Sequence, residues 1–341
     1  MIAALAMTAL SACSLAPGGS GDADDTVVLI SHDSFLASEE VLAEFEDLTG
    51  KRVEVRTVGD AGAMVNQLIL TKDSPLGDVV FGIDNTFASR ALDAGVLEAY
   101  EPAGADEQIR SLALDDTNRL TAVDYSDVCV NVDREWFEAA DVPEPTTLAD
   151  LADPAYRDLL VVQDPASSSP GLAFLLATVG AFGADGWEGY WEDLRENGVK
   201  VAAGWTDAYY VDFSGPSSEG SRPLVVSYAS SPPYEVPEGS DVAPTAALLE
   251  TCFRQVEYAG VLAGAADPAG ARELVDFLLS RTFQEDIPAN MYVYPALAAA
   301  ELPPDWVAFA PLAEEPFTVD AAQIAENRRA WIERWSEVVI G

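Results

Sequence analysis

The segment from Thr26 to Ile83 alternates between two hydrophobic patterns, and this alternation limits the possible fold more than any other feature of the sequence. Short runs rich in β-branched residues predict strands, and the runs between them carry apolar residues at helical spacing. The predicted strands are 26–31, 52–58 and 78–83, and the predicted helices are 38–49, which Gly50 ends, and 64–70. A β-α-β-α-β order requires right-handed crossovers and a parallel sheet. The sequence therefore predicts an α/β fold.

A second unit of the same kind begins near Val128. Its predicted strands are 159–163 and 223–228, and its predicted helices are 171–182 and 187–197. A chain of 341 residues is long enough for two lobes, each with its own apolar core. We therefore expect two α/β lobes joined by a hinge.

The rest of the chain is expected to return to the first lobe. A predicted strand over 253–261 precedes a helix over 269–279, and a last amphipathic helix over 320–338 has Thr318 as its candidate cap. The expected boundaries are 26–126 plus 255–317 for the first lobe, 127–254 for the second lobe, and 318–341 for a C-terminal helix that packs on the body.

Polar side chains follow the first three predicted strands. Asp33, Asp60 and Asp84 each lie at or just beyond the end of one of them. Ligands of open α/β sheets bind outside the carboxyl ends of the strands. Asp33 and Asp84 are therefore the candidate carboxylates for a positively charged ligand.

Aromatic and hydroxyl side chains gather in the later loops. The positions are Tyr125, Asp164–Gly171, Gly204–Tyr210 and Ser227–Tyr234. A flat cationic ring suits such a site, because each Tyr or Trp face attracts positive charge by ~1–2 kcal/mol when water is excluded. The serine-rich segment precedes a predicted helix, whose free N–H groups suit a hydroxyl or phosphate oxygen. The alternatives are core packing for the aromatic residues and a plain N-cap for the serines.

Residues 1–13 are apolar and end in Leu10-Ser11-Ala12-Cys13, the cleavage pattern of an exported lipoprotein. We expect a signal peptide over 1–13, lipid on Cys13, and an extracytoplasmic protein anchored to the outer face of the cell membrane. No Lys or Arg precedes Lys51, which departs from the usual positive start of such signals. Residues 14–25 are rich in Gly, Ser and Asp, a composition typical of a flexible tether.

Two cysteines, Cys129 and Cys252, lie in strand-like runs of the body. An exported protein folds in an oxidising compartment, where an even pair of cysteines favours a disulfide. We expect that Cys129 and Cys252 pair, and two buried thiols are the alternative.

The formal net charge of −40 argues against nucleic acid as a partner, because binding to a polyanion depends on a positive surface. A cationic or uncharged ligand is compatible with this charge. The alternative is that an acidic surface keeps the protein hydrated in salt, whatever the protein binds.

Catalytic templates are scarce in the chain. His32 is the only histidine, and HExxH, P-loop and nucleophile-elbow motifs are missing from the sequence. We therefore expect a protein that is not an enzyme and that has neither a metal site nor a cofactor. A secreted hydrolase is the alternative, since acidic pairs and serine loops are present.

Several collinear segments resemble the thiamine-binding substrate-binding proteins of bacterial ABC importers. They are His32–Phe35, Gly82–Asn85, Asp164–Leu172, Gly204–Tyr209, Ser227–Pro232, Ile287–Pro295 and Arg329–Trp331. The resemblance implies a type II periplasmic-binding-protein fold, in which two lobes close over thiamine or its phosphates. It also implies delivery of the ligand to a membrane permease. We expect a monomer that touches the membrane through its lipid anchor alone.

The resemblance also implies roles for individual residues. The aromatic walls would be Trp205, Tyr209, Tyr228 and Tyr292, Asp33 and Asp84 would address the cationic ligand, and Ser168 with Gly171 would face the hydroxyethyl or phosphate end. Tyr125, from the aromatic loops described above, is also expected to bind the ligand. His32 stands where many members have Tyr, and Tyr292 stands where others have Trp. The segment after Phe35 lacks the Gly/Pro-rich stretch of some members.

A sister family, the ferric-ion-binding proteins, is the main alternative. Its members bind iron through a tandem Tyr pair, a His and a carboxylate. This chain has Tyr209, Tyr210 and His32, so the same fold could hold a metal in place of a ring. A polyamine-binding relative would need several carboxylates along one cleft, and a purely structural protein would need no cleft.

Overall fold

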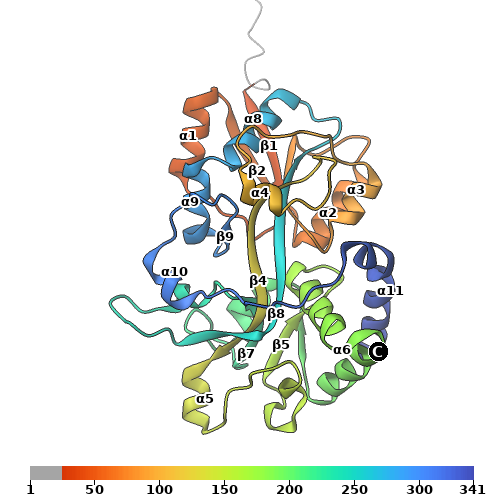
Figure 1. Ribbon diagram of the computed structural model, residues 1–341, viewed down its shortest axis with the longest axis vertical. Helices are drawn as coiled ribbons and strands as arrows, with labels where there is room; N and C mark the ends of the chain where they lie inside the picture. Colours follow the sequence, from red (N-terminus) through yellow and green to blue (C-terminus); the bar gives the residue numbers. More distant parts are fainter. Residues whose placement is uncertain (1–24) are drawn as a thin grey trace, which may run out of the picture.

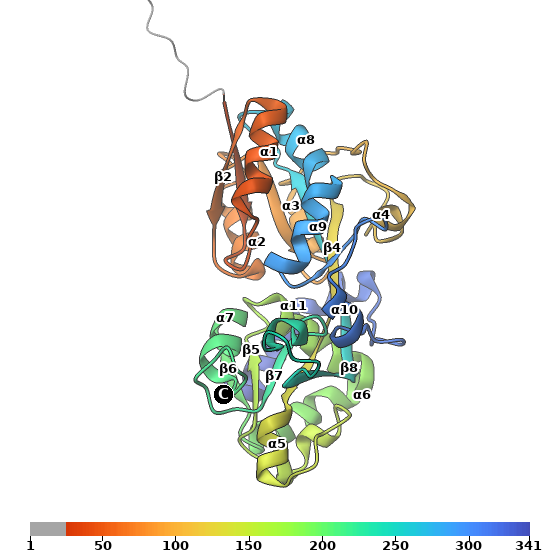
Figure 2. The same ribbon diagram turned by 90° about the vertical axis from the view of Figure 1, so that its left-hand side faces the viewer.

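The computed structural model of the protein describes residues 25–341. The predicted signal peptide, the predicted lipid on Cys13 and nearly all of the predicted tether lie outside the described residues. A 9-stranded mixed sheet has the order β2-β1-β3-β8-β4-β7-β5-β6, and β9 pairs with β4. Figures 1 and 2 show two lobes stacked along the long axis, with β4 and β8 running from one into the other. We call the lobe that holds β1 to β3 the first lobe and the lobe that holds β5 to β7 the second lobe.

The elements have the following bounds. The strands are β1 (Thr26–Ser31), β2 (Arg52–Thr57), β3 (Val79–Asp84), β4 (Thr121–Asp133), β5 (Leu160–Gln163), β6 (Lys200–Ala202), β7 (Leu224–Tyr228), β8 (Thr245–Val261) and β9 (Tyr294–Pro295). The helices are α1 (Glu39–Thr49), α2 (Ala61–Leu70), α3 (Ala88–Ala94), α4 (Glu107–Ser111), α5 (Arg134–Ala140), α6 (Ser169–Glu196), α7 (Trp205–Asp207), α8 (Pro268–Leu278), α9 (Arg281–Asn290), α10 (Pro304–Phe309) and α11 (Ala321–Val339).

The first lobe follows the predicted β-α-β-α-β order. β1 pairs in parallel with both β2 and β3, as predicted. The Ser38 side chain caps α1, and Gly50 ends that helix in the left-handed conformation, with φ 74°. Asp60 caps α2 by accepting a hydrogen bond from the N–H of Ala61. β8 then adds to β3 in antiparallel orientation, so the complete sheet is mixed.

The second lobe packs α6 against β7, β5 and β8. The two helices predicted over 171–182 and 187–197 are the two halves of α6, which is interrupted at Gly183 (φ 68°, ψ 179°). This glycine is positioned to break the helix because it adopts a positive φ without steric cost. The sheet of this lobe is also mixed, since β5 pairs in parallel with β6 and β7 whereas β7 is antiparallel to β4.

The C-terminal helix α11 packs on α6. The Trp191 and Trp335 rings meet edge to face with centroids 5.5 Å apart, and Ile324 and Trp335 are buried. The predicted cap Thr318 is wrong: Asp320 caps the helix, accepting hydrogen bonds from the second and third helical N–H groups. The helix begins at Ala321, so Thr318 lies too far upstream to reach those groups. The lobe boundaries given above stay predictions.

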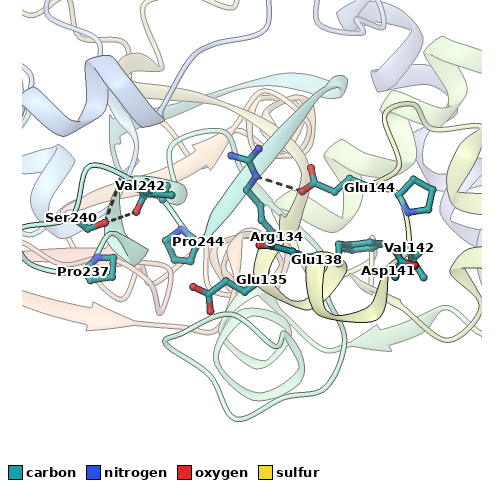
Figure 3. Close-up of a pocket in the computed structure, with 13 residues that line it drawn as sticks. Arg134, Glu135, Glu138, Asp141, Val142, Glu144, Pro237, Ser240, Val242 and Pro244 are labelled. Carbon is teal, nitrogen blue, oxygen red and sulfur yellow. Dashed lines mark hydrogen bonds and ion pairs between the residues drawn. The ribbon is translucent and has the colours of Figure 1, made fainter.

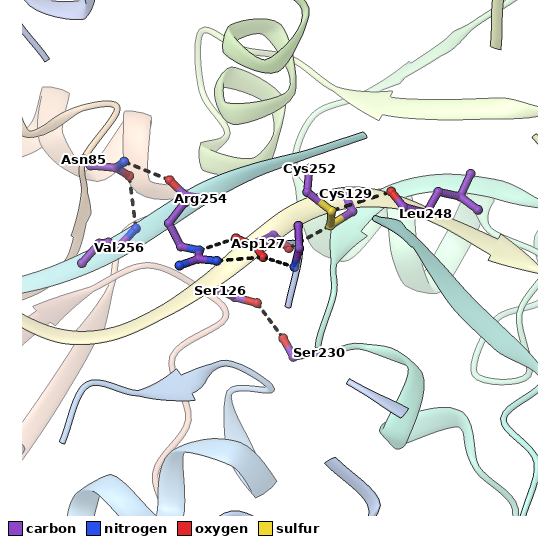
Figure 4. A network of polar contacts seen from close by, with 10 residues as sticks. Asn85, Ser126, Asp127, Cys129, Ser230, Leu248, Cys252, Arg254 and Val256 are labelled. Atoms are coloured by element: carbon purple, nitrogen blue, oxygen red, sulfur yellow. Dashed lines mark hydrogen bonds and ion pairs between the residues drawn. A yellow bond between two sulfur atoms is a disulfide. The ribbon is translucent and has the colours of Figure 1, made fainter. Parts of the chain in front are cut away.

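The two strands that connect the lobes are cross-linked. Cys129 on β4 and Cys252 on β8 form the disulfide that the sequence predicted. Close by, the Arg254 guanidinium pairs with the buried Asp127 carboxylate, as Figure 4 shows. Asp127 also accepts a hydrogen bond from the N–H of Ala313 at 2.8 Å. The connection between the lobes is therefore held by a covalent bond and an ion pair.

Candidate ligand-binding site

A cavity of about 410 Å³ lies between the two lobes, beyond the carboxyl ends of β1 and β2. The first lobe and the connecting strand β8 contribute His32, Asp33, Ser34, Phe35, Leu36, Asp60, Glu257, Asn290, Met291, Tyr292 and Val293. The second lobe contributes Ser169, Pro170, Trp205, Thr206, Tyr210, Tyr228 and Tyr234. Aromatic rings and carboxylates therefore face one enclosed space.

A second, larger hollow of about 900 Å³ lies between α5 and the segment 237–244. Figure 3 shows its lining, in which the Arg134 guanidinium pairs with Glu144 at 3.5 Å. Its one aromatic residue, Phe137, is 2% exposed and offers little ring surface to a ligand. It also lies on one lobe, away from the carboxyl ends of β1 and β2. The cavity between the lobes is therefore the candidate binding site.

Trp205 forms the centre of the aromatic wall on the second lobe. Its ring stacks on Tyr209 with centroids 5.0 Å apart and an interplanar angle of 19°. Tyr210 meets the same ring edge to face at 5.4 Å. The indole N–H donates to the Ser227 hydroxyl at 2.9 Å, which fixes the orientation of the ring. One face of the Trp205 ring thus packs on Tyr209, and the side chain borders the cavity.

Two tyrosines form a further aromatic group at the cavity. The Tyr234 and Tyr292 rings lie 4.5 Å apart, one from each lobe. Tyr292 has φ 56°, a conformation that costs energy for any residue with a Cβ. The Ser230 hydroxyl donates to the Tyr292 carbonyl at 2.6 Å and helps to hold this conformation. These rings therefore bring together segments that are far apart in the chain.

Asp60 joins the two lobes at the cavity. Its Oδ1 atom accepts from the N–H of Ala61 at 2.7 Å and from the N–H of Ser169, at the start of α6, at 3.3 Å. Burial raises the pKa of Asp60, while the Ala61 N–H and the charge of His32 oppose that rise. Asp60 therefore presents a partly desolvated carboxyl group to a ligand.

His32 and Glu257 form an ion pair at the cavity, with Nε2 and Oε2 3.6 Å apart. Burial lowers the pKa of His32, but the charge of Glu257 raises it, and the net shift is upward. Gly82 makes room for the imidazole, since a Cβ at this position would lie 2.1 Å from the His32 Cδ2 atom. Gly82 on β3 thus leaves space for the imidazole, and Glu257 on β8 balances its charge.

Asp124 on β4 lies opposite Glu257 on β8 in the strand register. It is fully buried, and among the described residues the Glu257 carboxyl group is the one polar side chain that interacts with its carboxyl oxygens. Burial raises the pKa of Asp124 well above its usual range, and the neighbouring charge of Glu257 raises it further. The rise favours the neutral, protonated form of Asp124 beside Glu257, which borders the cavity.

Comparison with known proteins agrees with this architecture. A family model described as bacterial extracellular solute-binding protein matches residues 74–313. The chain belongs to this family. No helix within residues 25–341 is long and apolar enough to cross a membrane.

Several known proteins are similar to this solute-binding protein over nearly its whole length. The thiamine-binding periplasmic protein of Brucella suis biovar 1 is 28% identical, covering 98% of each chain. That of Escherichia coli (strain K12) is 28% identical, covering 93% of this chain and 94% of its own. A solved periplasmic thiamin binding protein has a TM-score of 0.80 at 25% identity, covering 95% of this chain and 99% of its own. The predicted type II periplasmic-binding-protein fold is confirmed.

Part of the predicted site lines the cavity of the solute-binding protein. Asp33, Trp205, Tyr228 and Tyr292 all border it. Gln255 connects Tyr228 to Glu257 by hydrogen bonds. Its amide N–H₂ lies 3.3 Å from the Tyr228 hydroxyl and 3.3 Å from the Glu257 carboxylate. The ligand contacts of these residues stay predictions.

Other predicted residues lie behind the cavity wall in this structure. Asp84 is fully buried and accepts hydrogen bonds from the Ser169 hydroxyl and the Thr86 N–H. Tyr125 stacks on Tyr294 with centroids 5.6 Å apart, outside the cavity lining. Asp84 is therefore placed to order the start of α6, and Tyr125 to support the strand connection.

The remaining predicted residues, Ser168, Gly171 and Tyr209, also lie outside the cavity lining. Ser168 is buried as the N-cap residue of α6, and Tyr209 is 1% exposed beneath Trp205. Gly171 packs on β5, since a Cβ there would lie 2.6 Å from the Gln163 carbonyl oxygen. These positions follow from packing, because α6 and the segment Ala208–Asp212 both contact β5 and β7 of the second-lobe sheet.

Several residues that border the cavity are not among the predicted ligand-binding residues. They include Asp60, Ser169, Tyr210, Tyr234 and Glu257, of which Ser169, Tyr210 and Tyr234 lie in the predicted serine-rich and aromatic loops. A signal for Glu257 exists in the sequence, because a carboxylate interrupts a predicted buried strand there. Asp60 was recognised as polar at a strand end, but its contact with α6 depends on the packing of the two lobes.

Proposed function

We propose that this solute-binding protein captures thiamine or a thiamine phosphate and delivers it to the permease of an ABC importer. The observation that carries the proposal is the cavity between the lobes, where aromatic rings and carboxylates face the same space. Thiamine combines a flat ring system with a permanent positive charge. Tyr and Trp faces attract such a cation by ~1–2 kcal/mol each in a dry site. A volume of about 410 Å³ is also in the usual range for small-molecule pockets.

The relatives support the same ligand. The Brucella and Escherichia proteins are named for thiamine binding and cover almost the whole chain. Within the proposed site, Trp205 and Tyr228 stack on the ring system, and Glu257 and Asp60 balance its charge. Asp33, which is exposed at the cavity edge, adds a further negative charge.

The proposed role also implies where the protein acts and in what form. It acts outside the cytoplasm, carries lipid on Cys13, and works as a monomer that binds its ligand without chemical conversion. No nucleic acid or cofactor takes part. The disulfide between Cys129 and Cys252 suits an oxidising compartment.

Ferric-iron binding is the competing function, and the positions of its ligands disfavour it. Tyr210 and His32 border the cavity, but Tyr209 is buried beneath Trp205. Within the described chain, no group of three or more His, Cys, Asp and Glu side chains is arranged to hold a metal ion. The arrangement therefore favours an aromatic cation over a metal.

Calorimetric titration of the protein, freed of carried-over ligand by unfolding and refolding, tests the proposal. We expect one-to-one binding of thiamine with Kd at micromolar or better, about 8 kcal/mol or more. Trp205→Ala should weaken binding at least tenfold, whereas Trp136→Ala, which removes a half-buried Trp on α5, should leave Kd unchanged. If thiamine gives no binding signal and chelated ferric iron forms a coloured complex, the protein binds iron and the proposal is wrong.

A further inference from the structure

His32 is the single histidine of the chain and, among the described residues, the one basic side chain that borders the cavity. It is 9% exposed, and its Nε2 atom lies 3.6 Å from the Oε2 atom of Glu257. Glu257 is itself 7% exposed and borders the same cavity. The charge that a cationic ligand meets at this wall therefore depends on whether the imidazole carries a proton.

Acidic groups surround the imidazole on three elements of the structure. Glu257 lies on β8, Asp33 follows β1, and Asp60 stands at the start of α2. Burial lowers the pKa of His32, but the charges of Glu257, Asp60 and Asp33 raise it, and the net shift is upward. The imidazole of the empty cavity therefore holds its proton more tightly than an exposed histidine does.

The other elements around His32 and Glu257 contribute neutral or acidic groups. From β3 the Phe81 ring lies 5.8 Å from the imidazole, centroid to centroid, and Asp84 ends the same strand. Behind Glu257, burial raises the pKa of Asp124 on β4 and favours its neutral form. In the described part of the chain, the lining from the second lobe and from the end of α9 is aromatic, hydroxyl, amide or apolar. The balance at this wall is thus one imidazolium against several carboxyl groups.

We propose that His32 couples ligand capture to the release of a proton, because the imidazolium and a cationic ligand compete for the Glu257 carboxylate. The inference rests on the proposed function and adds a pH response to it. When the cation enters the cavity, the imidazolium gives its proton to the buffer, and Glu257 then balances the charge of the ligand. Affinity therefore increases with pH as His32 loses its proton, and capture is weaker in an acidic medium.

Proton NMR of the protein, prepared without a histidine tag, observes this step directly. The single histidine gives one set of imidazole C–H signals, so the titration of His32 is measured without overlap. In the ligand-free protein we expect a midpoint above the ordinary value of 6.5. Saturating thiamine should lower the midpoint by at least one pH unit. Glu257→Gln should lower the midpoint of the ligand-free protein, because burial then acts without the opposing carboxylate.

Calorimetric titration with thiamine measures the consequence for affinity. In the parent we expect Kd at pH 6.0 to be at least threefold weaker than at pH 8.0. Buffers of different ionisation enthalpy should report net proton release at pH 6.5. His32→Gln keeps an N–H donor beside Glu257 but does not titrate, so both effects should vanish. Any titration of thiamine itself cancels in this comparison, because the same ligand is used throughout.

Asp241→Asn is the control, because it removes one negative charge from an exposed loop outside the cavity lining. It should keep the pH dependence of the parent, which separates His32 from the net charge of −40. If His32→Gln does not fold, the NMR titration of the parent with and without thiamine still decides the proposal.

The outcomes distinguish this inference from the proposed function. Thiamine binding with equal Kd at both pH values, or a His32 midpoint that thiamine leaves in place, would overturn the coupling and leave the proposed function intact. A pH dependence that persists in His32→Gln would assign the proton to carboxyl groups such as Asp60 and overturn the role of His32. Failure of thiamine to bind at either pH would overturn both.

Discussion

Asp84 is a fully buried carboxyl group whose protonation should influence stability. Burial raises its pKa to about 6, and the Ser169 hydroxyl and Thr86 groups oppose this rise. Because the folded state holds the proton more tightly, Asp84 contributes stability that is fully present below pH ~4 and is lost as the pH rises through about 6. The contribution lost is on the order of 3 kcal/mol.

Asp84→Asn should remove this pH dependence, because an amide does not titrate and its oxygen can still accept from Ser169. We expect the free energy of unfolding of the variant, relative to the parent, to increase by about 2–3 kcal/mol between pH 4 and pH 7.5. Urea unfolding at both pH values measures this difference. Asp241→Asn, an exposed site, should show little change, and a constant difference for Asp84→Asn would contradict the prediction.

At the scale of elements, β4 and β8 form the connection between the lobes, and their disulfide closes a loop across 123 residues of sequence separation. Cross-linking such a long loop restricts the unfolded chain, so Cys129→Ala together with Cys252→Ala should lower the free energy of unfolding by about 2–4 kcal/mol. Neither sulfur borders the cavity, so Kd for the ligand should change less than threefold.

Thermal unfolding and calorimetry on the same samples check both parts. Either single Cys→Ala variant breaks the same bond and should cost about as much as the double variant. A double variant that melts like the parent would mean that the disulfide adds nothing to stability, and a large loss of binding would mean that it shapes the cavity.

At the scale of the whole molecule, the net charge of −40 should destabilise the folded state by repulsion among surface carboxylates. Salt shortens the screening length from about 10 Å at 0.1 M to about 3 Å at 1 M. We therefore expect Tm at pH 7.5 to increase by several degrees between 0.05 and 1 M NaCl. Scanning calorimetry at pH 4.5, where many carboxylates are partly protonated, should show a smaller increase, and a Tm independent of salt at pH 7.5 would contradict the explanation.

Local patterns in the sequence predict most individual elements of the first lobe. The order of β1, α1, β2, α2 and β3 follows from the hydrophobic periodicity, and Gly50 marks the end of α1 through local chemistry. The predicted start of the second helix at residue 64 misses its first turn, which Asp60 caps. Thr318 and Asp320 show the limit of such reasoning, because either residue type can cap a helix and a shift of two residues in the helix start decides between them. The disulfide was also predictable, since compartment and cysteine count restrict the pairing.

The sequence by itself determined the α/β class, the two-unit organisation and four of the residues that border the cavity: Asp33, Trp205, Tyr228 and Tyr292. Tertiary structure alone decided that Asp84 and Tyr209 are buried, and that Asp60 and Glu257 border the cavity. The physical reason is that residue type and position relative to a strand predict which side chains lie near the edge of the sheet. Which side chains keep access to the cavity depends on how the two lobes and the connecting strands pack together.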